Sequence, residues 1–468
     1  MKLYLKNIGP IDTIDINIDS DLTFIYGENN IGKSYAITIL YLFLKNYAFT
    51  FLQSRFFYSP SFRLLLDDER ILKNIKILFE NRNDFDITND VNQYFSNFLS
   101  TVFLSDFRNS LLSSFGDISN LKNKKSNEQL YIGVEFDDFF IHITDKNNKL
   151  IARYDGKGKN YSCKVVKQHR YPKTENNQVI LYYTKEEQFM EDIQFFFSNI
   201  YKKSVFSILS IINNVYYLPA SRSGLYRALN AFSQILAELA KKRKFLNEKI
   251  VLPSISEQDS DYFSRISEIN IKRKNQKFNS IAENIEKNLL NGEVSFNQAT
   301  KQILFHPSNI DINLELLGTS SMIAEVSPIV LYLRYIINSD ENIRRDHVNG
   351  GKPILFIEEP EAHLHPGAQT LLMECFVDLI KMGAKLVITS HSNYMFQKLN
   401  NLIAEKKIDK SVINGIILKQ GNNGSYSETI PMSDLGMEDK NFIEVAEILY
   451  YEKMKIIEKM EADDVKTN

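Results

Sequence analysis

The sequence predicts an α/β fold built on a mixed β-sheet, with an inserted helical subdomain and a short helical arm. Three observations support this prediction. A glycine-rich loop lies between an apolar run and a helix-like segment near the N-terminus. Residues 130–183 alternate between apolar and polar side chains, as an antiparallel β-meander does. Two continuous apolar runs, 354–357 and 385–389, have the composition of buried parallel strands.

The composition indicates a globular protein with a substantial core. The chain has 468 residues, of which 44% are hydrophobic, and 56 basic residues nearly balance 58 acidic ones. General attraction to nucleic acid or to a membrane is therefore not expected, and only local patches could supply it. The two cysteines, Cys163 and Cys375, fit a reducing compartment, and no apolar run reaches membrane-spanning length. We expect a cytoplasmic protein with no membrane partner.

Five segments follow from the order of these patterns. Residues 2–5 and 11–18 alternate as half-exposed strands do, and 22–26 is an apolar run followed by helical spacing at 35–44. Phenylalanine and leucine recur at helical spacing from about residue 51 to 120, and two polar helical stretches occur after residue 225. We therefore expect the N-terminal part of the main domain at 1–50, a helical insertion at 51–129, the β-meander and a core strand at 130–224, the helical arm at 225–300, and the C-terminal part at 301–468.

The loop at residues 27–34 reads G-E-N-N-I-G-K-S and matches the phosphate-binding pattern G-x-x-x-x-G-K-[ST]. Its backbone N–H groups would wrap phosphates at the start of a helix, and its two glycines allow a tight path. Lys33 would reach the β- and γ-phosphates of ATP, and the hydroxyl of Ser34 would bind Mg²⁺. The residues expected to contact the nucleotide here are Gly27, Asn29, Asn30, Gly32, Lys33 and Ser34.

Two acids follow the apolar run at 354–357. The carboxyl ends of parallel strands are where α/β proteins bind ligands, so Glu358 and Glu359 are expected to face the phosphates. Glu358 would hold Mg²⁺ directly or through water, and Glu359 would polarise and orient the attacking water. The alternative is a solvated acidic turn.

His391 follows the second apolar run, one crossover helix after the acids. From this position an imidazole could contact the γ-phosphate or the attacking water, so we predict a nucleotide-sensing role. A hydrogen-bonded loop histidine without such a role is the alternative.

Together, residues 7–10, 27–34, 358–366 and 389–391 resemble the ABC-type P-loop ATPase heads of the RecF, SMC and OLD-like group. The similarity covers both ends of the chain, roughly half of its length. It implies ATP and Mg²⁺ as cofactors and a homodimer, or a higher homo-oligomer, in which two heads sandwich two ATP molecules. Each site would be completed by a signature helix from the other subunit.

The resemblance also suggests further site residues. The candidate signature element is 318–322, where Ser320 and Ser321 could contact a γ-phosphate across the dimer, although it departs from the usual Leu-Ser-Gly-Gly-Gln pattern and could be an ordinary helix cap. A Pro-Ala-x-Arg element places Arg222 either against phosphate or at the dimer interface, with a structural ion pair as the alternative. His363 and His365 lie at the position of the family's D-loop and are expected at the dimer interface.

The resemblance favours an ATP-hydrolysing switch that regulates a separate effector protein, as in two-component anti-phage systems such as PARIS or Septu. No nuclease domain is expected, because the chain after His391 is short. A RecF-like DNA-repair ATPase is one alternative, because basic runs at 241–244 and 272–274 and lysines at 122–125 could attract DNA or RNA. A scaffold that binds ATP without hydrolysing it is the other.

Overall fold

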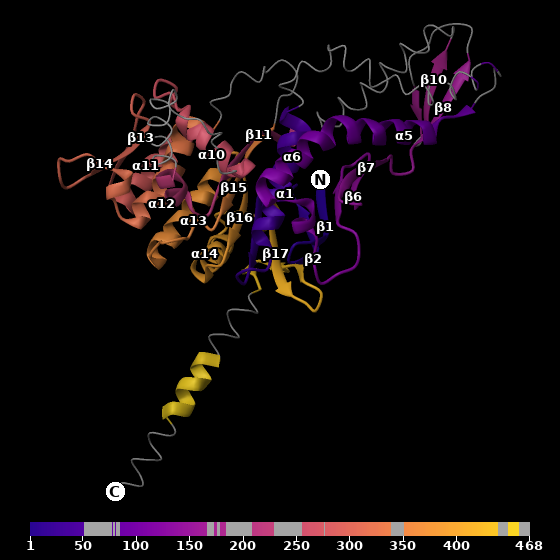
Figure 1. Cartoon of the computed structure of the whole chain (residues 1–468). Helices are drawn as coiled ribbons and strands as arrows, with labels where there is room; N and C mark the ends of the chain where they lie inside the picture. Colours follow the sequence, from indigo (N-terminus) through magenta and orange to yellow (C-terminus); the bar gives the residue numbers. More distant parts are fainter. Residues whose placement is uncertain are drawn as a thin grey trace, which may run out of the picture.

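The computed structural model describes residues 1–50, 85–165, 173–175, 178–183, 208–228, 255–275, 277–337, 351–438 and 448–457, with the single residues Ile77 and Glu80. Figure 1 shows a body of sheet and helices, from which α5 (Thr88–Phe98) reaches outward towards β8 (Asn160–Val165) and β10 (Gln178–Tyr183). A helix at 448–457 stands apart from this body. Within the described residues, no helix has both the length and the apolar character to cross a bilayer.

The body is organised on one mixed eleven-stranded sheet, which confirms the predicted fold class. One half is parallel and the other is antiparallel. The strands lie in the order β11 (Ile212–Leu218), β15 (Lys352–Glu358), β16 (Lys385–Ser390), β3 (Leu22–Gly27), β17 (Ile413–Gln420), β18 (Ser425–Thr429), β2 (Ile11–Asn17), β1 (Lys2–Ile8), β5 (Tyr131–Glu135), β6 (Phe140–Lys146) and β7 (Lys149–Asp155).

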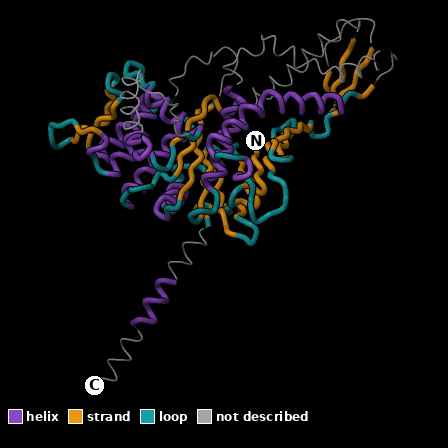
Figure 2. The backbone as a smooth tube through the Cα atoms, viewed as in Figure 1, coloured by secondary structure: helices purple, strands orange, loops and turns teal. Residues whose placement is uncertain are grey.

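Helices cover both faces of the sheet, as Figure 2 shows by colour. Side chains alternate along each buried strand, so Ile354 and Phe356 join one core while Leu355 and Ile357 join the other. The first core packs beneath α1 (Lys33–Leu44), α5 and α6 (Leu104–Phe115), with α7 (Ile118–Leu121) beside them. The second packs beneath α10 (Glu257–Ser267), α11 (Asn279–Ile285), α12 (Ser321–Leu331), α13 (Pro366–Lys381) and α14 (Asn393–Ala404).

Helices α1, α5, α11 and α12 continue as short π-helices, which are η1 (Lys45–Thr50), η3 (Leu99–Phe103), η5 (Glu286–Leu290) and η7 (Tyr332–Ile336). Two separate 3-10 turns are η6 (Leu316–Gly318), which follows β14, and η8 (Lys410–Val412), which precedes β17. The expected crossover between the two apolar runs is present, because β15, α13 and β16 form a parallel β-α-β unit.

The expected meander at 130–183 is only partly in the main sheet. β5, β6 and β7 extend it as antiparallel neighbours, but the following strands leave it. A separate sheet contains β4 (Phe85–Asp86), β8, β9 (Lys173–Glu175) and β10, and β8 and β10 pair in parallel. Two further small sheets contain β12 (Gly292–Asn297), β13 (Gln302–Pro307) and β14 (Leu314–Glu315), and β19 (Met432–Ser433) and β20 (Gly436–Met437).

The region expected as an arm is packed where the structure describes it. α10 and α11 bury Tyr262, Ile281 and Ile285 in the second core and do not extend away from the body. The apolar spacing of these helices, rather than their overall polarity, decides their position. Residues 229–254, with the basic run at 241–244, lie outside the described residues.

The two halves of the sheet are joined by β17 and β18, which the sequence analysis did not identify. β17 pairs in parallel with β3, and β18 pairs in parallel with β2. The turn before β18 lies close to the backbone just before β2, since a Cβ atom at Gly424 would lie 2.6 Å from the carbonyl oxygen of Pro10. Residues near the C-terminal end therefore connect the parallel half to the antiparallel half.

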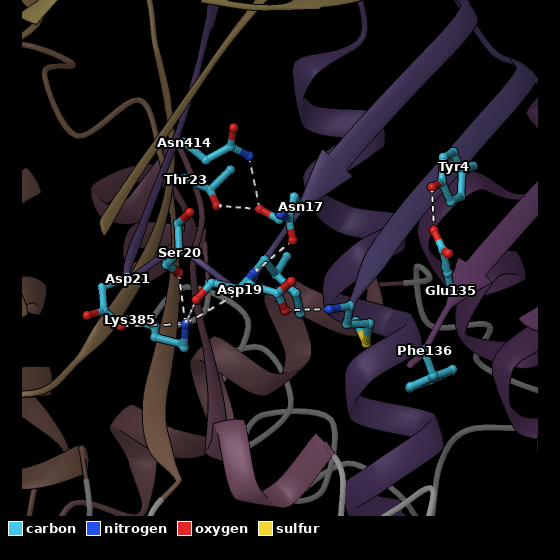
Figure 3. Close-up of polar contacts among 12 residues, drawn as sticks. Tyr4, Asn17, Asp19, Ser20, Asp21, Thr23, Glu135, Phe136, Lys385 and Asn414 are labelled. Carbon is cyan, nitrogen blue, oxygen red and sulfur yellow. Dashed lines mark hydrogen bonds and ion pairs between the residues drawn. The ribbon is translucent and has the colours of Figure 1, made fainter. Parts of the chain in front are cut away.

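Two lysines fix the amino ends of the parallel strands, and Figure 3 shows the contacts of one of them, Lys385. Nζ of Lys385 donates to the carbonyl oxygens of Asp19 at 2.7 Å and Ser20 at 2.8 Å, in the turn before β3. Nζ of Lys352, at the start of β15, donates to both carboxylate oxygens of Asp21 at 2.7 Å. Because these contacts align one end of β3, β15 and β16, the carboxyl ends of the three strands also lie together.

Candidate functional site

The loop at 27–34 turns sharply between β3 and α1. Gly27 and Gly32 adopt φ of 149° and 97°, and Asn30 adopts 63°. A Cβ atom at Gly27 would lie 2.7 Å from the carbonyl oxygen of Leu418 on β17, and one at Gly32 would lie 2.7 Å from Cγ1 of Ile11. Both the backbone angles and the surroundings therefore require glycine at these positions.

The start of α1 is open to an anion. Its N-cap residue is Gly32, and no side chain caps its first N–H groups. Asn29, Asn30 and Ser34 are exposed at this point. Uncapped N–H groups at a helix start attract phosphate through hydrogen bonding and the helix dipole. The loop is further held by Ser425 of β18, whose hydroxyl donates to the carbonyl oxygen of Ile31 at 2.5 Å.

Lys33 is buried, with its side chain folded back over the loop. Its Nζ atom donates to the carbonyl oxygens of Gly27 at 2.8 Å and Glu28 at 2.6 Å, and lies 3.2 Å from Nδ1 of His391. Burial lowers the pKa of Lys33 to about 8, against the opposing effect of the nearby carboxylates, chiefly Glu359. Burial therefore makes the charged form of this ammonium group less favourable than it is for a lysine in water.

Glu358 ends β15 in a buried position next to Ser34. Tyr217 donates its hydroxyl to Oε1 of Glu358 at 2.7 Å, and this hydroxyl lies 3.0 Å from Oγ1 of Thr38. Burial raises the pKa of Glu358, while hydrogen bonds from Tyr217 and Ser34 act in the opposite direction. The carboxylate is thus fixed in orientation beside the loop serine.

Glu359 and His391 contact each other near the exposed start of α1. Nε2 of His391 lies 3.3 Å from Oε1 of Glu359, so Nε2–H donates to the carboxylate while Nδ1 accepts from Lys33. The hydrogen bond from His391 is the main cause that lowers the pKa of Glu359. Glu359 has φ of 40°, and its N–H donates to the carbonyl oxygen of Thr389 at 3.0 Å. The structure therefore brings together Lys33, Glu359 and His391 from three separate segments.

Glu361 was not singled out from the sequence. Its Oε1 atom accepts from the hydroxyl of Ser390 at 2.9 Å and from the N–H of His391 at 2.6 Å. Oε2 of Glu361 is buried and has no hydrogen-bond partner in the described part of the chain. The sequence does show a third acid in the run from 358 to 361. Its hydrogen-bond partners, Ser390 and His391, become known only once β15 and β16 are placed side by side.

Arg222 is fully buried behind the acid pair. Its guanidinium donates to the carbonyl oxygens of Pro219 and Glu358, each at 2.9 Å, and lies 3.3 Å from Oε2 of Glu325 on α12. In this structure Arg222 therefore contacts the backbone at the end of β15 and a buried carboxylate. The structural ion pair, one of the two alternatives from the sequence, is present.

The candidate signature residues lie at the start of α12. Ser320 and Ser321 are exposed, and the Ser320 hydroxyl accepts from the N–H of Ile323 at 3.4 Å as the helix cap. α12 packs in the second core, whereas α1, which follows the phosphate loop, packs in the first. The sheet therefore separates α12 from α1 within one chain.

The two histidines of the loop after β15 are both exposed. His365 caps α13, accepting from the N–H of Gly367 at 3.3 Å. His363 adopts φ of 62° in the turn before α13. Among the described residues, histidine, cysteine, aspartate and glutamate do not gather in groups of three that could hold a metal.

The residues around Ser34 fit a Mg²⁺ ion bound together with a nucleotide. A hydroxyl and a carboxylate, those of Ser34 and Glu358, hydrogen-bond each other there. Mg²⁺ prefers oxygen ligands and is commonly held by one or two protein groups together with phosphate oxygens. The glycine-lined loop and its uncapped amides likewise suit a triphosphate.

These features define a P-loop ATPase head of ABC type, with a phosphate loop, an acid pair and a histidine at the carboxyl edge of a parallel sheet. The chain belongs to the AAA ATPase domain family, whose model matches residues 1–396. The prediction of an ABC-type head of the RecF and SMC kind is thereby confirmed. A search of curated proteins gives no match to the chain.

Similar solved structures include the SMC head domain from Thermotoga maritima, at 11% identity and a TM-score of 0.36, covering 92% of this chain and 98% of that one. An Smc head domain from Pyrococcus furiosus, bound to the C-terminal domain of ScpA, is 12% identical with a TM-score of 0.38, covering 98% of each chain. An SmcHead bound to the C-winged helix domain of ScpA is 11% identical with a TM-score of 0.39, covering 92% and 97%.

Proposed function

We propose that the protein hydrolyses ATP in the presence of Mg²⁺. The observation that carries this proposal is the contact chain from Lys33 through His391 to Glu359, with distances of 3.2 and 3.3 Å. These contacts bring an ammonium group, an imidazole and a carboxylate together beside the exposed start of α1. Phosphoryl transfer depends mainly on such positioning and on charge compensation.

Each residue has a distinct task in this proposal. Amides of the loop and Nζ of Lys33 would bind the β- and γ-phosphates, and Ser34 and Glu358 would hold Mg²⁺, which would neutralise phosphate charge. Glu359 accepts a hydrogen bond from the attacking water, since a lowered pKa keeps this carboxylate ionised. His391 orients Glu359 through Nε2 and contacts the γ-phosphate when Lys33 turns towards the nucleotide.

Phosphate release by wild type and Glu359→Gln tests this assignment. The variant should lose about a hundredfold or more in kcat while still binding ATP, because the base and not the phosphate loop is altered. Glu374→Gln is the matched control, since Glu374 lies on α13 and pairs with Lys398 away from the site. Equal and negligible rates in wild type and Glu359→Gln, with ATP bound by both, would support the non-hydrolysing scaffold instead.

We further propose that two copies close around two ATP molecules. The exposed hydroxyls of Ser320 and Ser321 begin a helix on the face opposite α1, so they suit a nucleotide held by a second copy. Light scattering on Glu359→Gln should show a doubled mass with ATP and Mg²⁺, and Ser321→Arg should abolish the doubling. A monomer under all conditions contradicts this arrangement.

A separate effector protein is the proposed target of the ATP cycle, and anti-phage defence is the proposed setting. The helix at 448–457 supports a protein partner, because it stands apart from the body with Leu449, Tyr450 and Tyr451 at least 60% exposed. A helix that is apolar on most sides is ordinarily covered. Copurification of a partner that is lost on deleting 448–457, with ATP hydrolysis kept, tests this part independently.

A further inference from the structure

Thr389 has a buried hydroxyl for which the fold supplies no partner. This residue lies near the carboxyl end of β16 and is 1% exposed, and its Oγ1 atom has no hydrogen-bond partner in the described part of the chain. Burying a hydroxyl without a hydrogen bond is unfavourable, and a valine side chain would fill nearly the same volume without that cost. A hydroxyl of this kind therefore suits a partner that is not part of the chain, such as a bound water.

The hydroxyl lies on the side of the sheet that carries the acid at the end of β15. Side chains alternate along a strand, so Val387 packs in the first core, Ile388 packs in the second, and Thr389 faces the first side again. Glu358 is on the same side, because Phe356 packs in the first core. Glu358 and Thr389 are cross-strand partners in the parallel pair of β15 and β16. Their side chains are therefore neighbours on the face that α1 covers.

Thr389 also adjoins the phosphate loop and the second acid. Its other cross-strand partner is Ile25 of β3, the strand that ends at Gly27, where the loop begins. The carbonyl oxygen of Thr389 accepts the N–H of Glu359 at 3.0 Å. The unpartnered hydroxyl thus lies between the strand that leads into the loop and the strand that precedes both acids.

The Glu358 carboxylate beside Thr389 has a fixed orientation. The hydroxyl of Tyr217 donates to Oε1 at 2.7 Å, and the hydroxyl of Ser34 and the N–H of Ala220 also hydrogen-bond this carboxylate. The ring of Tyr217 is held in place, because it is 2% exposed and stacks on Phe356. A carboxylate has about four acceptor positions, so these three donors leave room for a further one.

One water molecule could satisfy Glu358 and Thr389 together. A water donates two hydrogen bonds, and both a carboxylate and a threonine hydroxyl accept them. Two acceptors that share one water lie roughly 4.5 Å apart, close to the ~4.8 Å spacing of adjacent strands. Mg²⁺ gives up its water ligands reluctantly and usually keeps several of them in protein sites. A water of the hydrated cation therefore suits this pair of acceptors.

We propose that Thr389 is a positioning residue of the Mg²⁺ site, where its hydroxyl and the Glu358 carboxylate together hold one water ligand of the hydrated cation. Glu358 then acts on Mg²⁺ through this water, whereas Ser34 is available as a direct ligand. This inference rests on the proposed binding of ATP with Mg²⁺, and it adds a residue that no sequence motif singles out. A water that only completes the fold is the alternative, and its loss would not change the affinity for the cation.

Thr389→Val tests the hydroxyl, because it removes one polar atom from a buried side chain. The Mg²⁺ concentration that gives half of the metal-dependent gain in affinity for a fluorescent ATP analogue should rise about tenfold. Affinity in excess EDTA should stay unchanged, since the loop at 27–34 is unaltered. Thr389→Ser keeps the hydroxyl and should restore most of the Mg²⁺ dependence, which a loss of packing alone would not allow.

Thr23→Val is the matched control. Thr23 is also a strand residue that is 1% exposed, but its hydroxyl donates to the carbonyl oxygen of Asn17 at 3.2 Å, at the amino end of β3 (Figure 3). The Mg²⁺ dependence of this variant should equal that of wild type. Equal Mg²⁺ dependence in wild type and Thr389→Val would overturn the role of Thr389 alone. Nucleotide binding by wild type that is indifferent to Mg²⁺ would overturn the proposed function as well.

Urea denaturation in EDTA, without nucleotide, provides a second measurement. Thr389→Val should unfold at the same urea concentration as wild type or at a higher one, because its buried hydroxyl has no partner in the described part of the chain. Thr23→Val should unfold at a lower concentration, because it loses a hydrogen bond that the fold makes. A clear loss of stability in Thr389→Val would show that the hydroxyl completes the fold, and it would overturn the proposal.

Discussion

The ammonium nitrogen of Lys33 lies 3.2 Å from Nδ1 of His391 and so joins the phosphate loop to the loop after β16. This lysine is turned towards the backbone carbonyl groups of Gly27 and Glu28 and towards the imidazole. A triphosphate offers it a stronger, charged partner. In the proposed function, nucleotide binding would exchange one set of contacts of Lys33 for another and release His391 from it.

We predict that ATP affinity falls as pH rises above about 8. Burial lowers the pKa of Lys33 to about 8, so the free protein loses this proton above that pH, whereas bound phosphates favour the charged form. Binding then requires proton uptake, and affinity should fall by up to roughly tenfold per pH unit. The lowered pKa of Lys33 also reduces the free energy of unfolding. This loss of stability is complete below about pH 8, and it diminishes as the pH rises towards the pKa of a lysine in the unfolded chain.

Titration of ATP between pH 7 and 9.5 checks this prediction. Lys33→Arg is the control, because a guanidinium stays charged throughout this range. Its affinity should be weaker at pH 7 and then nearly constant. Parallel curves for the two proteins would contradict a role for the titration of Lys33.

We predict that Glu361 positions His391 without touching the nucleotide. Glu361→Ala removes the acceptor for Ser390 and for the N–H of His391, so kcat should fall between roughly ten- and a hundredfold with little change in KM. Glu361→Gln keeps an acceptor oxygen and should recover much of kcat. Because the Glu361 carboxylate also raises the pKa of Lys33, Glu361→Gln should move the loss of ATP affinity to lower pH. If both variants had the kcat and the pH profile of the wild type, Glu361 would have no such role.

We predict that Arg222 contributes mainly to stability. Arg222→Met leaves the carboxylate of Glu325, which is 2% exposed, without its cation and should destabilise the fold by about 3–5 kcal/mol. Adding Glu325→Gln should recover part of this loss, since the buried charge is removed. Urea denaturation of the two variants measures both effects. A fully stable Arg222→Met that has lost ATP binding would instead assign Arg222 to the nucleotide.

The parts of the site that follow from local pattern were predictable. The phosphate loop is one octapeptide, and the acids and His391 each follow a buried strand, so parallel pairing alone brings them to one edge. Glu361 and Tyr217 could not be assigned, because their partners lie on other strands whose order no local pattern gives. The same reason hid β17 and β18, which carry no motif.

The helical arm predicted at 225–300 shows a second limit of prediction from the sequence. Residues 262–290 are polar enough to suggest an exposed helical stretch, yet the apolar side chains of α10 and α11 pack in the second core. A moderate apolar stripe is sufficient when a large sheet face needs a cover. Average polarity therefore misjudged where these helices lie.

The position of β17 and β18 has a consequence for biosynthesis. β3 emerges from the ribosome well before its pairing partners, β16 and β17, and before Ser425, which holds the loop at 27–34. Until these segments are present, the loop at 27–34 lacks the neighbours that fix its backbone. Contacts between segments so distant in sequence also form slowly. The loop at 27–34 therefore takes its final shape only after β16, β17 and Ser425 have been synthesised and have folded against it.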